Sequence, residues 1–162
     1  LSKSQKEQKE VQEAVDAGQS ALSTAESILS SLDSAHGWGV YDMLGGGLIA
    51  DIAKHDKLEE AQRKMENLQR ELKSFQRELT DVSSHAEVQI EVSGFMKFAD
   101  YFFDGFLVDW MVQDKIDQSI SQIQNIRKEI ETILAQLKKT KASLEAEANE
   151  SRTKREQFIK KA

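Results

Sequence analysis

One pattern occurs twice in this sequence, and this repeat constrains the fold more than any other feature. Residues 47–58 read GLIADIAKHDKL, and residues 105–116 read GFLVDWMVQDKI. A shift of 58 positions places Asp51 on Asp109, and apolar residues fall on apolar residues around them. Each copy is followed by a long stretch with heptad-spaced apolar residues. The sequence therefore predicts two related apolar elements, each of which leads into a coiled-coil helix.

Three segments have the spacing of helices that bury a single stripe. In residues 2–34, small or aliphatic residues recur every three or four positions. In residues 56–83 and 113–150, apolar residues hold heptad spacing between Glu, Gln, Arg and Lys. The chain contains no proline, which would break such helices. We therefore expect an all-α protein with an antiparallel coiled-coil stalk of three long helices.

The connector between the second and third helices, residues 84–94, has a different pattern. Val88, Ile90 and Val92 alternate with polar residues, which is typical of a half-buried strand, although a helix could also use Val88 and Val92. The second helix carries the chain roughly 35–45 Å from its start, and an extended segment returns it over that distance better than a helix does. We therefore expect a short extended return at residues 86–93.

Nearly all aromatic residues lie in two segments, 36–55 and 95–112, which contain most of the two repeat copies. Because a three-helix stalk has no room for them, we expect the segments to pack on each other in a compact pseudo-twofold head. The alternative is an up-down-up bundle with the copies at opposite ends. With an exposed or frayed tail at 150–162, the whole chain, 1–162, forms one helical domain. The aromatic residues expected in the head are Trp38, Tyr41, Phe102, Phe106 and Trp110.

Aspartates at matched positions of the repeat are the main candidates for chemistry. Asp51 and Asp109 lie inside apolar runs, where a carboxylate must be paired, hydrogen-bonded or metal-bound. His55 lies one helical turn from Asp51, so a metal site of Asp51, His55 and Asp109 is one alternative. We expect instead that these aspartates, with the matched pair Asp42 and Asp100, are structural acceptors that cap helices or bind aromatic N–H and O–H groups. No cofactor is expected.

Composition excludes several classes of function. The net charge of −6 argues against nucleic-acid binding, which needs a basic surface. The absence of cysteine excludes disulfides and thiolate metal sites. No catalytic constellation is recognisable, so we do not expect an enzyme. The chain shows no signal peptide, which favours the cytoplasm, but it begins at Leu1 and could be a fragment.

Two resemblances bear on the fold. The motif WG-x-YD-x-LGGG followed by KH, within residues 38–61, resembles a motif of uncharacterised bacterial coiled-coil proteins, and FADYFFDG at 98–105 belongs with it. This resemblance implies a helical fold and little about activity. In outline, a helical stalk with an apolar head is also similar to α-helical pore-forming toxins. However, neither apolar segment reaches the ~20 residues of a spanning helix, and both contain aspartates.

Together these observations favour a non-enzymatic helical interaction or scaffolding module. Its expected partner is a protein or a second copy, bound through the coiled-coil helices, and a membrane is the less favoured partner. The heptads of the third helix extend past those of the second, which leaves an apolar edge for the first helix, another copy or a separate helical protein. The residues of this edge are Ile133, Leu137 and Leu144.

Overall fold

The structure, a computed structural model, is built from helices throughout its described part. The backbone is described for residues 2–43, 47–84, 90, 92–101 and 116–161, and the side chains for 2–31, 59–60, 62–84, 90, 92–101 and 120–160. The helices are α1 (Lys3–Met43), α2 (Gly47–Ser83), α3 (Ser93–Tyr101) and α5 (Ile116–Lys161). The prediction of an all-α fold is confirmed.

The helices extend further than the sequence patterns suggested. α1 continues to Met43 instead of ending near residue 34, and α2 already begins at Gly47 instead of residue 56. The first copy of the repeat therefore forms the opening turns of α2. α1 continues through Gly37 and Gly39, because glycine costs a helix only about 1 kcal/mol per residue. At its other end, α5 runs as one helix to Lys161.

The expected extended return at residues 86–93 is not seen as a strand in the described residues. Ile90 and Val92 belong to no regular element, and α3 begins at Ser93. Residues 86–89 and 91 lie outside the described part. A helix does form directly after this segment. Phe95 and Ala99, which are four residues apart, supply the buried face of α3.

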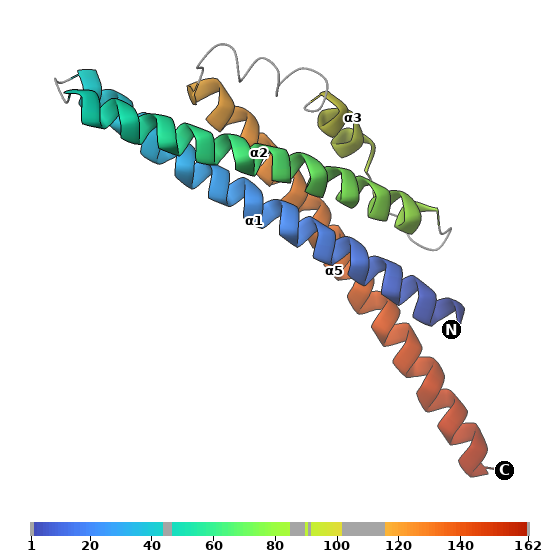
Figure 1. Cartoon of the computed structure of the whole chain (residues 1–162). Coiled ribbons are helices and arrows are strands. Elements are labelled where there is room, and N and C mark those ends of the chain that lie inside the picture. The colour runs from blue at the N-terminus through green and yellow to red at the C-terminus, as the bar shows by residue number, and fades with distance from the viewer. Residues whose placement is uncertain (1, 44–46, 85–89, 91, 102–115, 162) are drawn as a thin grey trace.

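α1 is the central helix of the bundle. Figure 1 shows α1 and α2 side by side and running in opposite directions, with α5 crossing behind them and continuing past the N-terminus of α1. The side-chain amide of Gln8 donates a 3.5 Å hydrogen bond to the carbonyl oxygen of Leu144, which fixes the antiparallel register of α1 and α5. α1 packs along both α2 and α5.

The stripe of small residues on α1 allows α2 and α5 to approach it at the same level. A Cβ atom added to Gly18 would lie 2.7 Å from Cδ2 of Leu134 and 2.9 Å from ring atoms of Phe75. Gly18 therefore marks a level at which α1, α2 and α5 meet. Phe75 and Leu134 are 59 positions apart, close to the 58-residue shift of the repeat.

The buried stripes of α2 and α5 match at the same shift. Met65, Leu68, Leu72, Phe75 and Leu79 of α2 are buried in the core, and each lies 58 positions before a buried residue of α5. These matching residues are Ile123, Ile126, Ile130, Ile133 and Leu137. α2 and α5 are thus equivalent partners of α1, which extends the internal repeat from its apolar copies into the helices that follow.

α3 is attached to the middle of the stalk. The rings of Phe75 and Phe95 pack edge to face, with centroids 5.3 Å apart and an interplanar angle of 61°. Ala99, one turn further, is also buried. The beginning of the second segment expected in the head therefore packs on the stalk, about 40 Å along α2 from its start at Gly47. Any pairing of the two repeat copies involves side chains outside the described residues.

Candidate interaction surfaces

The apolar edge expected on the third helix is covered within the chain. Ile133, Leu137 and Leu144 are only 2%, 0% and 7% exposed and belong to the hydrophobic core. The hydrogen bond from Gln8 to the Leu144 backbone shows that α1 reaches this level of α5. The sequence allowed this edge to be covered by the first helix, by another copy of the chain or by a separate protein. In the structure the first helix, α1, covers it.

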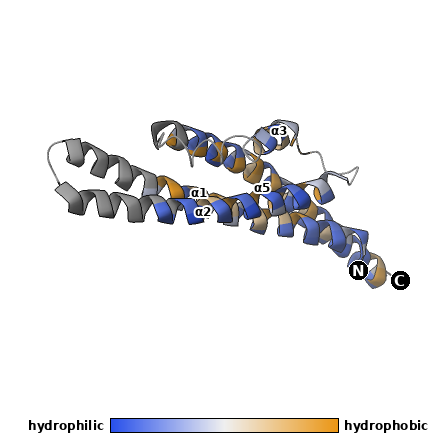
Figure 2. Ribbon diagram, turned by 45° about the horizontal axis from the view of Figure 1, so that its top comes forward, coloured by the Kyte–Doolittle hydropathy of each residue, from blue (hydrophilic) through white to orange (hydrophobic). Residues whose placement is uncertain are grey.

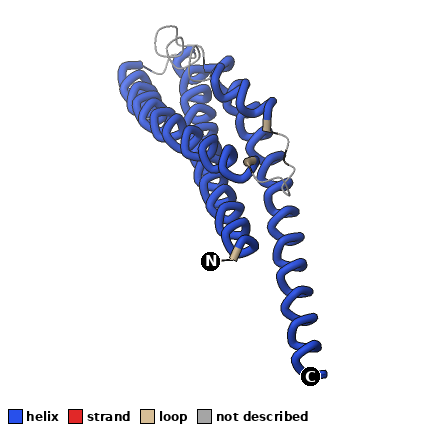
Figure 3. The backbone as a smooth tube through the Cα atoms, turned by 90° about the vertical axis from the view of Figure 1, so that its right-hand side faces the viewer, coloured by secondary structure: helices blue, strands red, loops and turns tan. Residues whose placement is uncertain are grey.

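Beyond this level, α5 leaves the bundle. Gln8 is level with Leu144, and α1 begins at Lys3, so the antiparallel register places residues 150–161 past the end of α1. We call these residues the α5 overhang. Figure 3 shows this part of α5 extending alone among the described helices, over roughly 18 Å. The exposed tail expected at 150–162 is thus an exposed helix over its described length.

The α5 overhang carries two large apolar side chains in solvent. Phe158 is 77% exposed and Ile159 is 72% exposed. Figure 2 shows this apolar end of α5 beside the C-terminus, after a long polar stretch. Among the described residues, Tyr101 at the end of α3 is the other large exposed apolar residue, at 63%. The sequence pattern alone gave no reason to single out Phe158 and Ile159, since two apolar residues do not make a heptad stripe.

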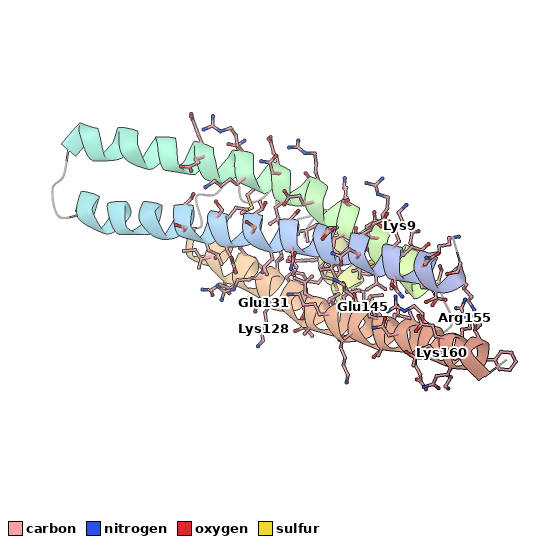
Figure 4. The ribbon with its side chains drawn as sticks, turned by 90° about the horizontal axis from the view of Figure 1, so that it is seen from below. Lys9, Lys128, Glu131, Glu145, Arg155 and Lys160 are labelled. Atoms are coloured by element: carbon pink, nitrogen blue, oxygen red, sulfur yellow. The ribbon has the colours of Figure 1, made fainter. Side chains whose placement is uncertain are left out.

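The charges of the overhang differ from those of the rest of the chain. It holds five basic residues and two acidic ones, a net charge of +3 in a chain of net charge −6, so the remainder carries −9. Lys154 and Glu150 form a 3.1 Å ion pair, and Arg152 donates a 3.2 Å hydrogen bond to Asn149. Figure 4 places Arg155 and Lys160 near the end of α5. The overhang is therefore a basic element on an acidic protein.

Acidic residues gather where α1 meets the second half of α2. Glu13 of α1 lies near Glu78 and Asp81 of α2, and Lys9 is 3.7 Å from Glu13. Partial burial, and then repulsion by Glu13 and Asp81, raises the pKa of Glu78 above its ordinary value of 4.5. We call Glu13, Glu78 and Asp81 the acidic seam. Its carboxylates repel one another, so it weakens the α1–α2 contact at neutral pH.

One carboxylate is almost completely buried. Glu7 of α1 is 3% exposed, and its Oε1 accepts no hydrogen bond from the described residues. It lies next to Gln8, at the level where α1 covers the last buried residue of α5. A buried carboxylate oxygen without a hydrogen-bond partner costs stability.

A shallow polar depression of about 510 Å³ lies between α1 and α2. It offers two carboxylates and three hydroxyl groups, but the described residues contain no group of three His, Cys, Asp or Glu side chains that could hold a metal ion. The depression therefore shows no catalytic or metal-binding arrangement. Its lining residues are Asp16, Gln19, Ser20, Ser23, Thr24 and Glu71.

The residues predicted for the head and the metal alternative are only partly described. The backbone of Trp38, Tyr41 and Asp42 belongs to α1, and that of Asp51 and His55 to α2, but their side chains lie outside the described part. Phe102, Phe106, Asp109 and Trp110 lie entirely outside the described part, backbone included.

Asp100 is the one predicted acceptor whose side chain is described. It is exposed in the last turn of α3 and not at a helix start.

No described helix is long and apolar enough to cross a membrane. Comparison of the chain with protein-family models, curated proteins and solved structures found no match.

Proposed function

We propose that this protein is a non-enzymatic helical interaction module, in which the bundle supports a binding element at the end of α5. The observation that carries this proposal is the exposure of Phe158 and Ile159 on a helix that has left the bundle. Neither side chain contributes to the core. We take these two neighbouring side chains as the centre of the binding surface, because contiguous exposed apolar groups mark interaction sites on soluble proteins.

The bundle is suited to hold such an element rigidly. α5 has 46 residues and is therefore roughly 70 Å long, and its first part is fixed by buried contacts with α1. Because the overhang continues the same helix without a break, its orientation is set by the bundle. A pre-ordered binding helix avoids much of the ordering entropy that a disordered tail loses on binding.

The proposal is tested by crosslinking from defined positions of the overhang. A photoreactive phenylalanine analogue replaces Phe158 in cells that naturally make the protein, and a matched variant carries the analogue at Thr153. Thr153 lies on the opposite side of the helix, where its hydroxyl donates a hydrogen bond to the carbonyl of Asn149. We expect discrete adducts, with protein or with lipid, from position 158 and none of them from position 153. The same background from both positions would contradict the proposal.

A further inference from the structure

We infer that the α5 overhang binds an anionic membrane surface, lying in the interface with Phe158 and Ile159 in the lipid and its arginines on lipid phosphates. This inference rests on the proposed function and names the partner of the same element. It starts from the arrangement of charge and apolar surface around the helix. No other described helix packs along this part of α5 (Figure 3).

One face of the overhang combines both features. Successive residues of an α-helix are turned by about 100°, so Arg152, Phe158 and Ile159 all lie within about 60° of Arg155. The two acidic residues, Glu150 and Glu156, lie about 100° or more from Arg155. We call Arg152, Arg155, Phe158 and Ile159 the basic–apolar face. On such a face the arginine stems can extend along the apolar groups to lipid phosphates while Phe158 and Ile159 enter the acyl boundary.

The overhang also holds the apolar end of this face, Phe158 and Ile159, away from the acidic bundle. Its length of roughly 18 Å exceeds the Debye length of about 8 Å at physiological salt. At the tip, the −9 charge of the remaining chain is therefore largely screened, while the local +3 charge acts on a nearby anionic surface. An amphipathic segment without this separation would be repelled together with the bundle.

A second copy of the chain fits this face less well. The acidic seam would attract the arginines, but Glu13 is exposed beside Lys9 and the seam provides no exposed large apolar residue for Phe158. Among the described residues, such side chains are found only at Tyr101 and on the overhang itself. Pairing two overhangs would bring two basic segments together. A lipid surface satisfies the charge and the apolar side chains at once.

Vesicle sedimentation of the full chain tests the inference. Vesicles of phosphatidylglycerol mixed with phosphatidylcholine should sediment the protein at physiological salt, while vesicles of phosphatidylcholine alone should not. Arg155→Gln should weaken binding about five-fold, because a basic residue near an anionic surface contributes about that factor. Phe158→Ala should weaken it at least about ten-fold. The matched control Lys160→Gln removes the same charge about 140° away and should change binding by less than about two-fold.

Several results would overturn the inference. The first is that the protein does not sediment with anionic vesicles. The second is that Arg155→Gln and Lys160→Gln weaken vesicle binding equally. The third is that the protein binds duplex DNA as strongly as vesicles and that Phe158→Ala does not change the DNA binding. Self-association that Arg155→Gln abolishes would assign the face to a second copy. All variants should retain the wild-type thermal unfolding temperature, because these side chains lie outside the bundle. Protein adducts from position 158 without vesicle binding would leave the proposed function intact and remove the lipid partner alone.

Discussion

Replacement of Gly18 by alanine tests the contact at which α1, α2 and α5 meet. In a solvent-exposed helix this change would stabilise the protein by about 1 kcal/mol, because glycine is the poorer helix former. Here the new methyl group would lie 2.7 Å from Cδ2 of Leu134 and 2.9 Å from the ring of Phe75. Both side chains are buried, so they cannot swing into solvent. Overpacking of this kind costs about 1–3 kcal/mol, and we expect a net loss of about 1 kcal/mol.

Urea unfolding followed by circular dichroism measures this loss, and Gly94→Ala is the matched control. A Cβ atom at Gly94 meets nothing within 4 Å, so this variant should be neutral or more stable by up to about 0.5 kcal/mol. Leu134→Ala alone should cost about 2–5 kcal/mol. In the double variant, Leu134→Ala also relieves the clash, so the two losses should not add, with a coupling of about 0.5–3 kcal/mol. Equal stabilisation by Gly18→Ala and Gly94→Ala would refute the three-helix contact.

Three further changes probe other parts of the molecule. Phe95→Ala should destabilise the protein by about 3–5 kcal/mol and release α3 from the bundle of α2 and α5. Limited proteolysis within residues 93–101 should reveal the release, and unchanged protection there would show that Phe95 does not hold α3. Glu7→Leu should raise the free energy of unfolding by about 1–3 kcal/mol, because it removes a buried carboxylate oxygen without a partner, and a loss of stability in urea would show that Glu7 is paired. Glu78→Gln should stabilise the protein at neutral pH. The pKa of Glu78 is higher in the folded state than in the unfolded state, so the wild type loses stability as the pH rises through that pKa, and glutamine avoids this loss. The gain should therefore disappear below the ordinary pKa of 4.5. A gain from Glu78→Gln that is constant across pH would contradict this reasoning.

The sequence predicted the stripes of the bundle well because heptad spacing is a local property. Met65, Leu68, Ile123 and Ile126 were expected on buried stripes from their spacing alone, and all four are buried. Helix boundaries were less accurate. Residues 36–55 were assigned to a separate head because of their aromatic content, but their described backbone continues α1 to Met43 and α2 from Gly47.

Spacing also could not tell which helix covers which stripe. Ile133, Leu137 and Leu144 needed a partner, but only the antiparallel register of α1 against α5 shows that α1 supplies it. The basic–apolar face was missed for a related reason. Phe158 becomes informative only once α5 is known to continue as a helix past the end of α1, because its exposure depends on what lies beside it. The metal alternative at Asp51, His55 and Asp109 stays a prediction, which elemental analysis of the purified protein can test.

The equivalence of α2 and α5 creates a competition during folding. Both helices present matching stripes to α1 at the same register, so side-chain fit alone distinguishes poorly between them. Chain connectivity resolves the competition, since three residues separate α1 from α2, whereas α5 begins 73 residues after Met43. Short loops close at little entropic cost and contacts of low sequence separation form early. We therefore expect the α1–α2 hairpin to form first and α5 to dock on the remaining side of α1, an order that a circular permutation opened between α1 and α2 would reverse.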